Sequence, residues 1–359
     1  MPDRPWDLRP VGEDEPPPVD PPRWPSVCIV VPARNEATYL PRTLPALLAQ
    51  DYPGDWRIVL VDDRSSDGTS EVALRLAGPR LGVVQGRPLA EGWRGKPWAM
   101  AQGAEAAGDA DYLLLTDADI LHGPGSLRRL AAESELAGLS LNSRMARLHT
   151  GSAAERLLVP PFLFFFNLLY PMRRVNRPGR TAAAAGGCVL LRRDALSAIG
   201  GFSAIRGEII DDVNLARAVK GSGRTIRLST SRGEVTSLRE YPTVGVFWLT
   251  VRRTAYDELG YSPLLLAGTV AGLALLFLLP PLLALLALAW LPGAWHWRLV
   301  LGLEGVLAWA VMSLVYLPTV VFFQLRRSWA LTLPLAGVLY GGMTVDSAGR
   351  HVLRGQAGW

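Results

Sequence analysis

Two groups of carboxylates stand directly after apolar runs of the chain, where they suit the binding of a metal ion and a nucleotide. Asp62-Asp63 follow the apolar residues 58–61, and Asp117-x-Asp119 follow residues 112–116. Such runs are typical of buried parallel strands, whose carboxyl ends form the ligand-binding edge of an open α/β sheet. Two carboxylates at that edge suit a hard divalent cation that also contacts a substrate diphosphate. Burying both carboxylates without a cation would be costly.

Some of the candidate binding residues near these carboxylates also have simpler structural interpretations. Asp62-Asp63 can accept hydrogen bonds from a uracil N3–H or a ribose hydroxyl, whereas residues 65–67 suit the capping of the next helix. Lys96 precedes a predicted helix, where it can reach a diphosphate as a point charge or remain solvated. His122 stands three residues after Asp119 and is a lesser candidate for the metal.

A third acidic group, Glu208 with Asp211-Asp212, stands at the start of a predicted helix. The helix dipole alone favours carboxylates there, so a structural role is one interpretation. The other is catalytic, because inverting sugar transfer needs a general base to deprotonate an acceptor hydroxyl. Neighbouring like charges would raise the pKa of such a base.

Strands and helices alternate at short spacing around these residues. This alternation predicts an α/β fold with a mostly parallel, doubly wound sheet. After Asp119 the pattern loosens, with a strand near residues 184–191 and a helix over residues 211–221. In the first part we expect strands at 27–32, 56–61, 82–85 and 112–116, and helices at 35–50, 69–77 and 97–107.

The last third of the chain is apolar enough to enter a membrane. Residues 263–291 and 299–325 each exceed the roughly 20 residues that a span needs, and residues 330–345 are a weaker third candidate. Pro280-Pro281 predict a kink or a tight hairpin, so we expect two to four transmembrane helices. Trp290, Trp295, Trp297 and Trp329 fall at the predicted interfaces.

A shorter apolar segment, residues 157–170, is followed by an arginine cluster. Interrupted by Pro160-Pro161, it is too short to span a bilayer of roughly 30 Å. It suits a helix in the membrane interface with its arginines on anionic headgroups, or else a buried core helix. The domains expected are a Pro-rich disordered tail at residues 1–25, a catalytic domain at 26–260 with an interfacial segment at 157–175, and a membrane domain at 261–359.

Overall charge and cysteine usage exclude other classes. Lys and Arg number 37 against 32 Asp and Glu, a formal charge of +5 that is too small to suggest nucleic-acid binding. Cys28 and Cys188 lack the spacing of a metal site or redox pair, which predicts two buried reduced thiols. Residues 1–25 contain no apolar stretch and are not a signal peptide.

The order of these motifs resembles that of family 2 glycosyltransferases of the GT-A fold. The resemblance covers about residues 26–255, and the apolar last third makes the whole chain similar to the hopanoid-biosynthesis-associated membrane glycosyltransferases of bacteria. The segments that carry it are Val31-Pro-Ala-Arg-Asn-Glu36, residues 61–69, Gly95-Lys96, Thr116-Asp-Ala-Asp119, Gly186-Gly187 and Asp211-Asp212-x-x-Leu215.

The resemblance implies a role for each matching residue. Asp117 and Asp119 would hold Mg²⁺ or Mn²⁺ on the donor diphosphate, and Asp212 would be the catalytic base, with Asp211 its nearest rival. The residues implied in binding the nucleotide-diphospho sugar are Pro32, Ala33, Arg34, Glu36, Asp62, Asp63, Lys96, Asp117, Arg252 and Arg253.

Two departures from the family pattern refine the expectation. Processive members carry Gln-x-x-Arg-Trp, whereas residues 248–254 keep only the Arg, which favours transfer of a single sugar. Relatives often begin with a membrane helix, whereas this chain begins with the Pro-rich tail.

We therefore expect a membrane-bound, inverting, metal-dependent glycosyltransferase that uses a nucleotide-diphospho sugar, in particular a UDP-sugar, and a lipid acceptor. Arginines beside the apolar segments place the catalytic domain on the cytoplasmic side of the bacterial inner membrane. The alternatives are a sugar-nucleotide nucleotidylyltransferase, or a membrane scaffold or lipid transporter with an inactive domain. The first would need a Gly-rich phosphate loop, and the second is disfavoured by intact acidic motifs and by spans whose one acidic residue is Glu304.

Overall fold

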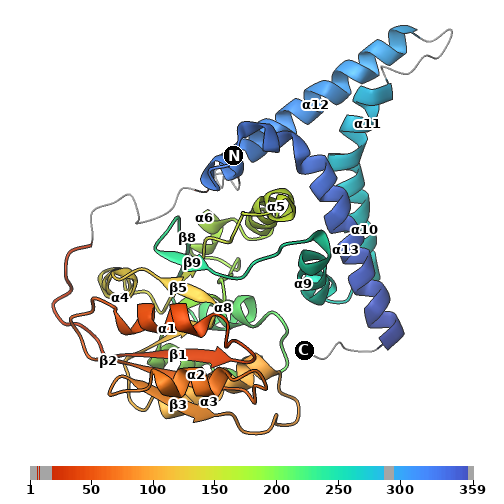
Figure 1. The fold of residues 1–359 in the computed structure, drawn as a ribbon. Helices are drawn as coiled ribbons and strands as arrows, with labels where there is room; N and C mark the ends of the chain where they lie inside the picture. The colour runs from red at the N-terminus through yellow and green to blue at the C-terminus, as the bar shows by residue number, and fades with distance from the viewer. Residues whose placement is uncertain (1–5, 7, 9–17, 287–294, 355–359) are drawn as a thin grey trace.

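The computed structural model describes residues 6, 8, 18–286 and 295–354. An α/β domain forms the first part, and long helices form the second and extend away from it (Figure 1). Three parts of the sequence for which we made predictions lie outside the described residues. They are Trp290, most of the Pro-rich tail and the last five residues.

The α/β domain is built on a seven-stranded sheet with the order β3-β2-β1-β4-β7-β6-β8. The first four strands are parallel, as predicted, but β7 runs antiparallel to both β4 and β6. A separate antiparallel pair joins β5 to β9. The strands are β1 (Val27–Ala33), β2 (Trp56–Asp62), β3 (Leu81–Gln85), β4 (Tyr112–Thr116), β5 (Ile120–His122), β6 (Leu141–Met145), β7 (Cys188–Arg192), β8 (Ile226–Thr230) and β9 (Val235–Ser237).

Helices cover both faces of this sheet, as its strand sequences require. In β1, Cys28 and Val30 pack with α3 and α8, whereas Ile29 and Val31 pack with α1 and α4. Alternate residues of a strand point to opposite faces, so a strand that is apolar throughout must be buried on both. The helices of this domain are α1 (Leu40–Leu48), α2 (Thr69–Arg75), α3 (Gly95–Ala106), α4 (Ser126–Leu136), α5 (Ala153–Leu169), α6 (Met172–Val175), α7 (Arg193–Ala198), η1 (Gly201–Ile205), α8 (Asp211–Gly221) and α9 (Val244–Glu258).

The first helix begins later than predicted. We expected it to start at Asn35, but α1 starts at Leu40. The reason is local, because Asn35 has a φ of 58°, a left-handed conformation that ends the strand and cannot begin a right-handed helix. Residues 34–39 are thereby left as a loop at the carboxyl end of β1.

Among the described residues, four helices are long and apolar enough to cross a membrane: Ala153–Val175, Pro263–Leu286, His296–Phe322 and Arg327–Leu353. In the second, α10 (Pro263–Leu273) continues through a π-helical turn η2 (Ala274–Leu278) into α11 (Leu279–Leu286). The tight hairpin considered at Pro280-Pro281 is therefore absent, because the π-helical turn takes up the hydrogen-bonding mismatch before the prolines. The last helices are α12 (Trp295–Phe322), η3 (Arg327–Thr332) and α13 (Leu333–Arg354).

The segment predicted to lie in the membrane interface is part of a longer helix. α5 runs over 17 residues, and both Pro160 and Pro161 are buried within it. It packs against α9, α12 and α13, between the α/β domain and the apolar helices. Ser152 begins it with a capping box to Glu155.

The described end of the Pro-rich tail is packed on the α/β domain. Asp20 forms an ion pair with Arg128 at 2.8 Å, and the rings of Trp24 and Tyr52 meet edge to face. Both cysteines are buried free thiols, as predicted.

The contact between α3 and the sheet depends on a glycine. A Cβ on Gly103 would lie 2.3 Å from Cγ1 of Val30 and 3.2 Å from Cγ2 of Val61. We expect Gly103→Ala to destabilise the domain by about 1–3 kcal/mol, because overpacking outweighs the gain in helix propensity. Thermal unfolding followed by circular dichroism measures it. Gly221→Ala in α8, where a Cβ meets nothing within 4 Å, is the control and should be neutral or stabilising; a neutral Gly103→Ala would contradict this packing.

Candidate active site

A cavity of about 650 Å³ opens at the carboxyl ends of β1, β2 and β4. Its lining includes ten of the residues that the sequence predicted to bind the donor or the metal ion, or to catalyse the reaction. These residues come from segments that are far apart in the chain. They are Pro32, Ala33, Arg34, Glu36, Asp63, Lys96, Asp117, Asp119, Asp212 and Arg253.

The loop after β1 is held against the loop after β2. The N–H of Asn35 donates to Oγ of Ser65 at 2.9 Å, and the side-chain oxygen of Asn35 accepts from the N–H of Ser66 at 2.8 Å. The N–H of Glu36 donates to Oγ1 of Thr69 at 2.8 Å. These bonds fix the two loops as one unit and thus place Arg34 and Glu36 at the cavity.

The side chain of Lys96 connects two of the acidic groups. Its Nζ lies 2.7 Å from Oδ1 of Asp117 and 3.6 Å from Oδ2 of Asp211. Burial lowers the pKa of Lys96, but the surrounding carboxylates of Asp117, Asp211 and Asp212 outweigh it and raise the pKa above its ordinary value. Lys96 is therefore a permanent positive charge at the cavity, and not a solvated side chain.

Arg239 plays the corresponding part for Asp119. Its Nε donates to Oδ2 of Asp119 at 2.9 Å, and its Nη2 donates to Oε1 of Glu36 at 2.7 Å. Burial raises the pKa of Glu36, and the guanidinium opposes that shift. Burying the Asp-x-Asp carboxylates without a cation was expected to be costly, and in this structure the positive charges of Lys96 and Arg239 compensate them.

Asp212 lies in the first turn of α8 and faces the cavity. The N–H of Gly186 donates to its Oδ2 at 2.7 Å, and the N–H of Val213 donates to its Oδ1 at 2.8 Å. Burial and the neighbouring Asp211 raise the pKa of Asp212 to about 6, against the opposing charge of Lys96. Gly186 allows this approach, because a Cβ there would lie 3.0 Å from Nζ of Lys96.

The side of the cavity formed by α5 and α9 carries apolar side chains, together with Thr250 and Arg253 of α9. Phe162 and Phe166 reach it from α5, and Leu249 reaches it from α9. Tyr241, in the segment before α9, completes this side and packs edge to face on Phe247. The cavity thus combines a charged wall at the sheet with a largely apolar side made by α5 and α9.

Three predicted residues do not line this cavity. The carboxylate of Asp62 accepts hydrogen bonds from the N–H of Ser65 and from the hydroxyl of Ser70, which is a loop-holding role. Arg252 points to α13, where its Nη1 lies 3.3 Å from Oδ2 of Asp346. Asp211 is paired with Lys96 and is not among the residues that line the cavity.

His122 is also excluded from the cavity. Its ring is buried, and its nitrogens share hydrogen bonds with the hydroxyls of Thr116 at 2.8 Å and Ser126 at 3.2 Å. Burial lowers its pKa to about 4, so the ring is neutral.

Sequence reasoning missed Arg239, Tyr241 and the cavity-facing side of α5. Arg239 was passed over because one arginine between a short strand and a helix has no distinctive spacing. The available signal was its position two residues after β9, whose partner strand β5 begins directly after Asp119.

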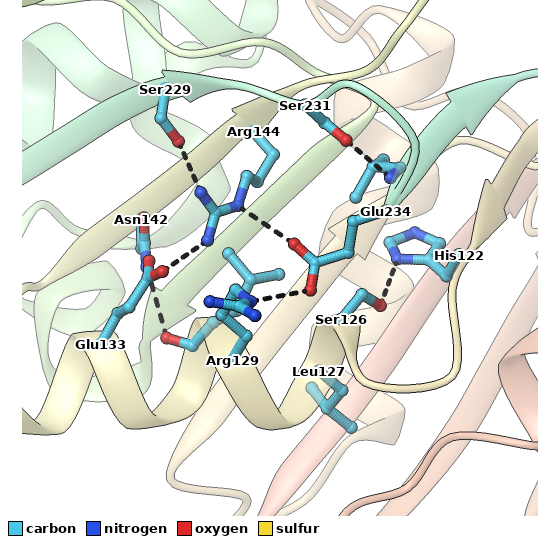
Figure 2. Close-up of polar contacts among 12 residues, drawn as sticks. His122, Ser126, Leu127, Arg129, Glu133, Asn142, Arg144, Ser229, Ser231 and Glu234 are labelled. Carbon is cyan, nitrogen blue, oxygen red and sulfur yellow. Dashed lines mark hydrogen bonds and ion pairs between the residues drawn. The ribbon is translucent and has the colours of Figure 1, made fainter. Parts of the chain in front are cut away.

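A buried ionic network braces the β8–β9 segment that carries Arg239 (Figure 2). Arg144, fully buried, donates to Glu133 at 2.6 Å and to Ser229 at 3.0 Å. Glu234, directly before β9, accepts from Nε of Arg129 at 3.2 Å. Charges buried in this way are stable only while paired, so β9 is fixed where Ser237 and Arg239 can reach Asp119.

The Arg239 pairs can be tested by stability. Arg239→Gln leaves Glu36 and Asp119 without this cation, and its cost should fall between the about 1 kcal/mol of an exposed pair and the roughly 3–5 kcal/mol of a buried one. The pKa of Glu36 rises further, so the loss should be largest at pH 8 and shrink toward pH 5, where the carboxyl is increasingly protonated. Thermal midpoints at both pH values measure it, with Arg253→Gln as control; an equal loss at both pH values would contradict the pairing.

Comparison with known proteins is consistent with this geometry. Residues 28–200 match Glycosyl transferase family 2. The chain is 29% identical over 203 residues to a beta-monoglucosyldiacylglycerol synthase of Synechocystis sp., covering 54% of this chain and 40% of that protein. It is 30% identical over 196 residues to an N-acetylglucosaminyltransferase of Mesorhizobium japonicum, covering 52% of this chain and 43% of that protein. The chain thus spans about two fifths of the length of these curated relatives.

A solved structure shows the same architecture. A mannosyltransferase from Pyrobaculum calidifontis, in complex with GDP-Man and Mn²⁺, superposes with a TM-score of 0.54 at 18% identity, covering 98% of this chain and 91% of that one. This likeness shows the fold. Residues 28–200 therefore form a glycosyl transferase family 2 domain, in a chain with a GT-A-like fold.

Proposed function

We propose that this protein is a membrane-bound, inverting glycosyltransferase that moves one sugar from a nucleotide-diphospho sugar to a lipid acceptor. One observation carries the proposal. A single cavity joins the Asp-x-Asp carboxylates, Lys96 and Asp212 on one wall to apolar side chains of α5 and α9 on the other. A charged donor and an apolar acceptor can therefore meet at one place.

The relatives support the reaction class and the kind of acceptor. Of the two relatives described above, one is named an N-acetylglucosaminyltransferase and the other is named as the synthase of a monoglucosyldiacylglycerol, which is a lipid. A UDP-sugar as donor and a hopanoid as acceptor rest on the resemblance of the sequence motifs, and the lipid class rests on the apolar wall and the four candidate spans.

The charge of the cavity fits a divalent cation, Mg²⁺ or Mn²⁺. Five carboxylates and four cationic side chains line it, and Asp211 behind Lys96 adds a sixth carboxylate, an excess of two negative charges. Oε2 of Glu36 is buried without a hydrogen-bond partner among the described residues. Within those residues no group of three or more metal-ligating side chains occurs. Asp117 and Asp119 would thus supply two ligands, and diphosphate and water the others, as is usual for Mg²⁺.

The residues of the cavity have different roles in the proposed reaction. When bound, the cation neutralises charge that develops on the leaving diphosphate. Lys96 adds a second positive charge there. Asp212 accepts the proton of the acceptor hydroxyl, whose oxygen attacks the anomeric carbon from the face opposite the diphosphate. The bond from that carbon to the diphosphate oxygen breaks, and the sugar changes its anomeric configuration.

The membrane arrangement follows from the same parts. The apolar helices after residue 262 anchor the chain, and we place it in the bacterial inner membrane with its catalytic domain in the cytoplasm. Arg326 lies between the last two candidate spans and Arg327 begins the last one, and the positive-inside rule favours the cytoplasmic side for both. Arg252 is held by Asp346 and not by the cavity, so the family's processive motif is not reproduced and we favour single-sugar transfer.

Donor binding should depend on the cation through Asp119. Asp119→Ala removes a proposed ligand, so calorimetric titration with UDP should show Mn²⁺-dependent binding in the wild type and none in the variant. Asp51→Ala, an exposed carboxylate away from the cavity, is the control. Equal UDP affinity of the wild-type protein with Mn²⁺ and with EDTA would contradict the metal assignment.

Turnover should depend on Asp212 as the base. Asp212→Asn keeps the shape but cannot accept a proton, so turnover should fall roughly 10²–10⁴-fold while donor affinity stays near that of the wild type. In the wild type, turnover should fall as the pH drops below about 6, where Asp212 becomes protonated. Release of nucleoside diphosphate measures both. Asp211→Asn should retain most turnover, and the reverse result would move the base to Asp211.

A further inference from the structure

A second cavity, of about 580 Å³, lies between the α/β domain and the turn that joins α12 to η3. It shares no lining residue with the candidate active site. Arg147 and Thr150 line it from the segment that leads into α5, and Arg156 lines it from the first turn of α5. The turn contributes Phe323, Gln324, Leu325 and Arg326, and η3 contributes Trp329.

Three guanidinium groups converge on this cavity, and none of its lining residues is acidic. Arg147 donates to the carbonyl oxygen of Arg232 at 3.2 Å and to Oε1 of Gln324 at 3.5 Å. Arg156 donates to the carbonyl oxygens of Thr150 at 3.1 Å and Gly151 at 2.8 Å. These acceptors are neutral, so the contacts orient the arginines without balancing their charge.

Other arginines of the domain have their charge balanced by a carboxylate. Arg128, Arg144 and Arg239 each form an ion pair with a carboxylate. Within the described part of the chain, Arg147, Arg156 and Arg326 form no such pair. Like charges held together in this way repel each other, and an anion between them removes the repulsion. Guanidinium groups match the oxygens of a phosphate particularly well, because they donate two parallel hydrogen bonds.

The position of the cavity indicates where such a phosphate comes from. Arg326 separates the candidate span His296–Phe322 from the candidate span Arg327–Leu353, so it lies at the predicted surface of the bilayer. Trp329 suits the headgroup level, and Phe323 and Leu325 add apolar surface. A ligand that carries a phosphate at one end and acyl chains at the other satisfies both parts of the lining.

We propose that this cavity binds the phosphate headgroup of an anionic membrane lipid. The bound lipid joins the α12–η3 turn to residues 147–156 of the α/β domain. Leu148 in that segment lines the candidate active site, and α5 begins within the segment at Ala153. The lipid would therefore hold the active site in a fixed position on the membrane.

The test uses the full-length protein in detergent and native mass spectrometry. We expect the wild type to retain phosphatidylglycerol in preference to phosphatidylcholine with the same acyl chains. Arg326→Gln and Arg147→Gln should each lower the retained phosphatidylglycerol roughly tenfold or more, the effect of losing one charge-assisted hydrogen bond to the phosphate. Arg327→Gln is the matched control, because this neighbouring arginine is equally exposed but does not line the cavity, and it should leave retention unchanged.

A second measurement separates lipid binding from folding and from free phosphate. Phosphatidylglycerol should raise the thermal midpoint of the wild type and of Arg327→Gln, and raise it less for Arg326→Gln, which keeps the wild-type circular dichroism spectrum. Inorganic phosphate should not reproduce the rise. The proposal is overturned if Arg327→Gln loses as much lipid as Arg326→Gln, if phosphatidylcholine is retained equally, or if inorganic phosphate stabilises the protein as well as the lipid does.

Discussion

Carboxylates gathered at one edge of the sheet must be neutralised, and the rest of the structure is arranged around that requirement. Lys96 pairs with Asp117 and Asp211, and Arg239 pairs with Asp119 and Glu36. Negative charge still exceeds positive charge there, and burial raises the pKa values of Glu36 and Asp212. A site in this state is suited to take up a divalent cation and to hold a base that ionises near neutral pH.

Each neutralising side chain is positioned by a part of the fold that lies outside the cavity. Gly103 lets α3 approach the sheet, and Lys96 stands at the start of that helix. The buried pairs around Arg144 and Glu234 fix β9 and thereby Arg239 (Figure 2). On the membrane side, Trp248 and Arg252 bind Asp346 of α13, which sets α9 and its cavity-lining residues against the apolar helices.

Much of the catalytic half could be predicted because its signals are local. Apolar runs ending in Asp62 and Asp117 indicated strands, and helix α8 was predicted with its observed bounds, Asp211–Gly221. The antiparallel β7 and the pairing of Asp119 with Arg239 could not be predicted, because they depend on contacts between residues far apart in the chain. The helix at Pro160-Pro161 was underestimated for a similar reason, since packing against α9, α12 and α13 outweighs the local cost of proline.

The central claim, that one cavity transfers a sugar from a nucleotide to a lipid, is tested most directly by its product. Purified full-length protein is incubated with labelled nucleotide sugars, Mn²⁺ and extracted lipids, and the lipid fraction is examined by mass spectrometry. The account predicts one lipid species heavier by a single sugar residue, joined with inverted anomeric configuration. Label found only in free sugar or in soluble products with every donor, or a product with retained configuration, would contradict it.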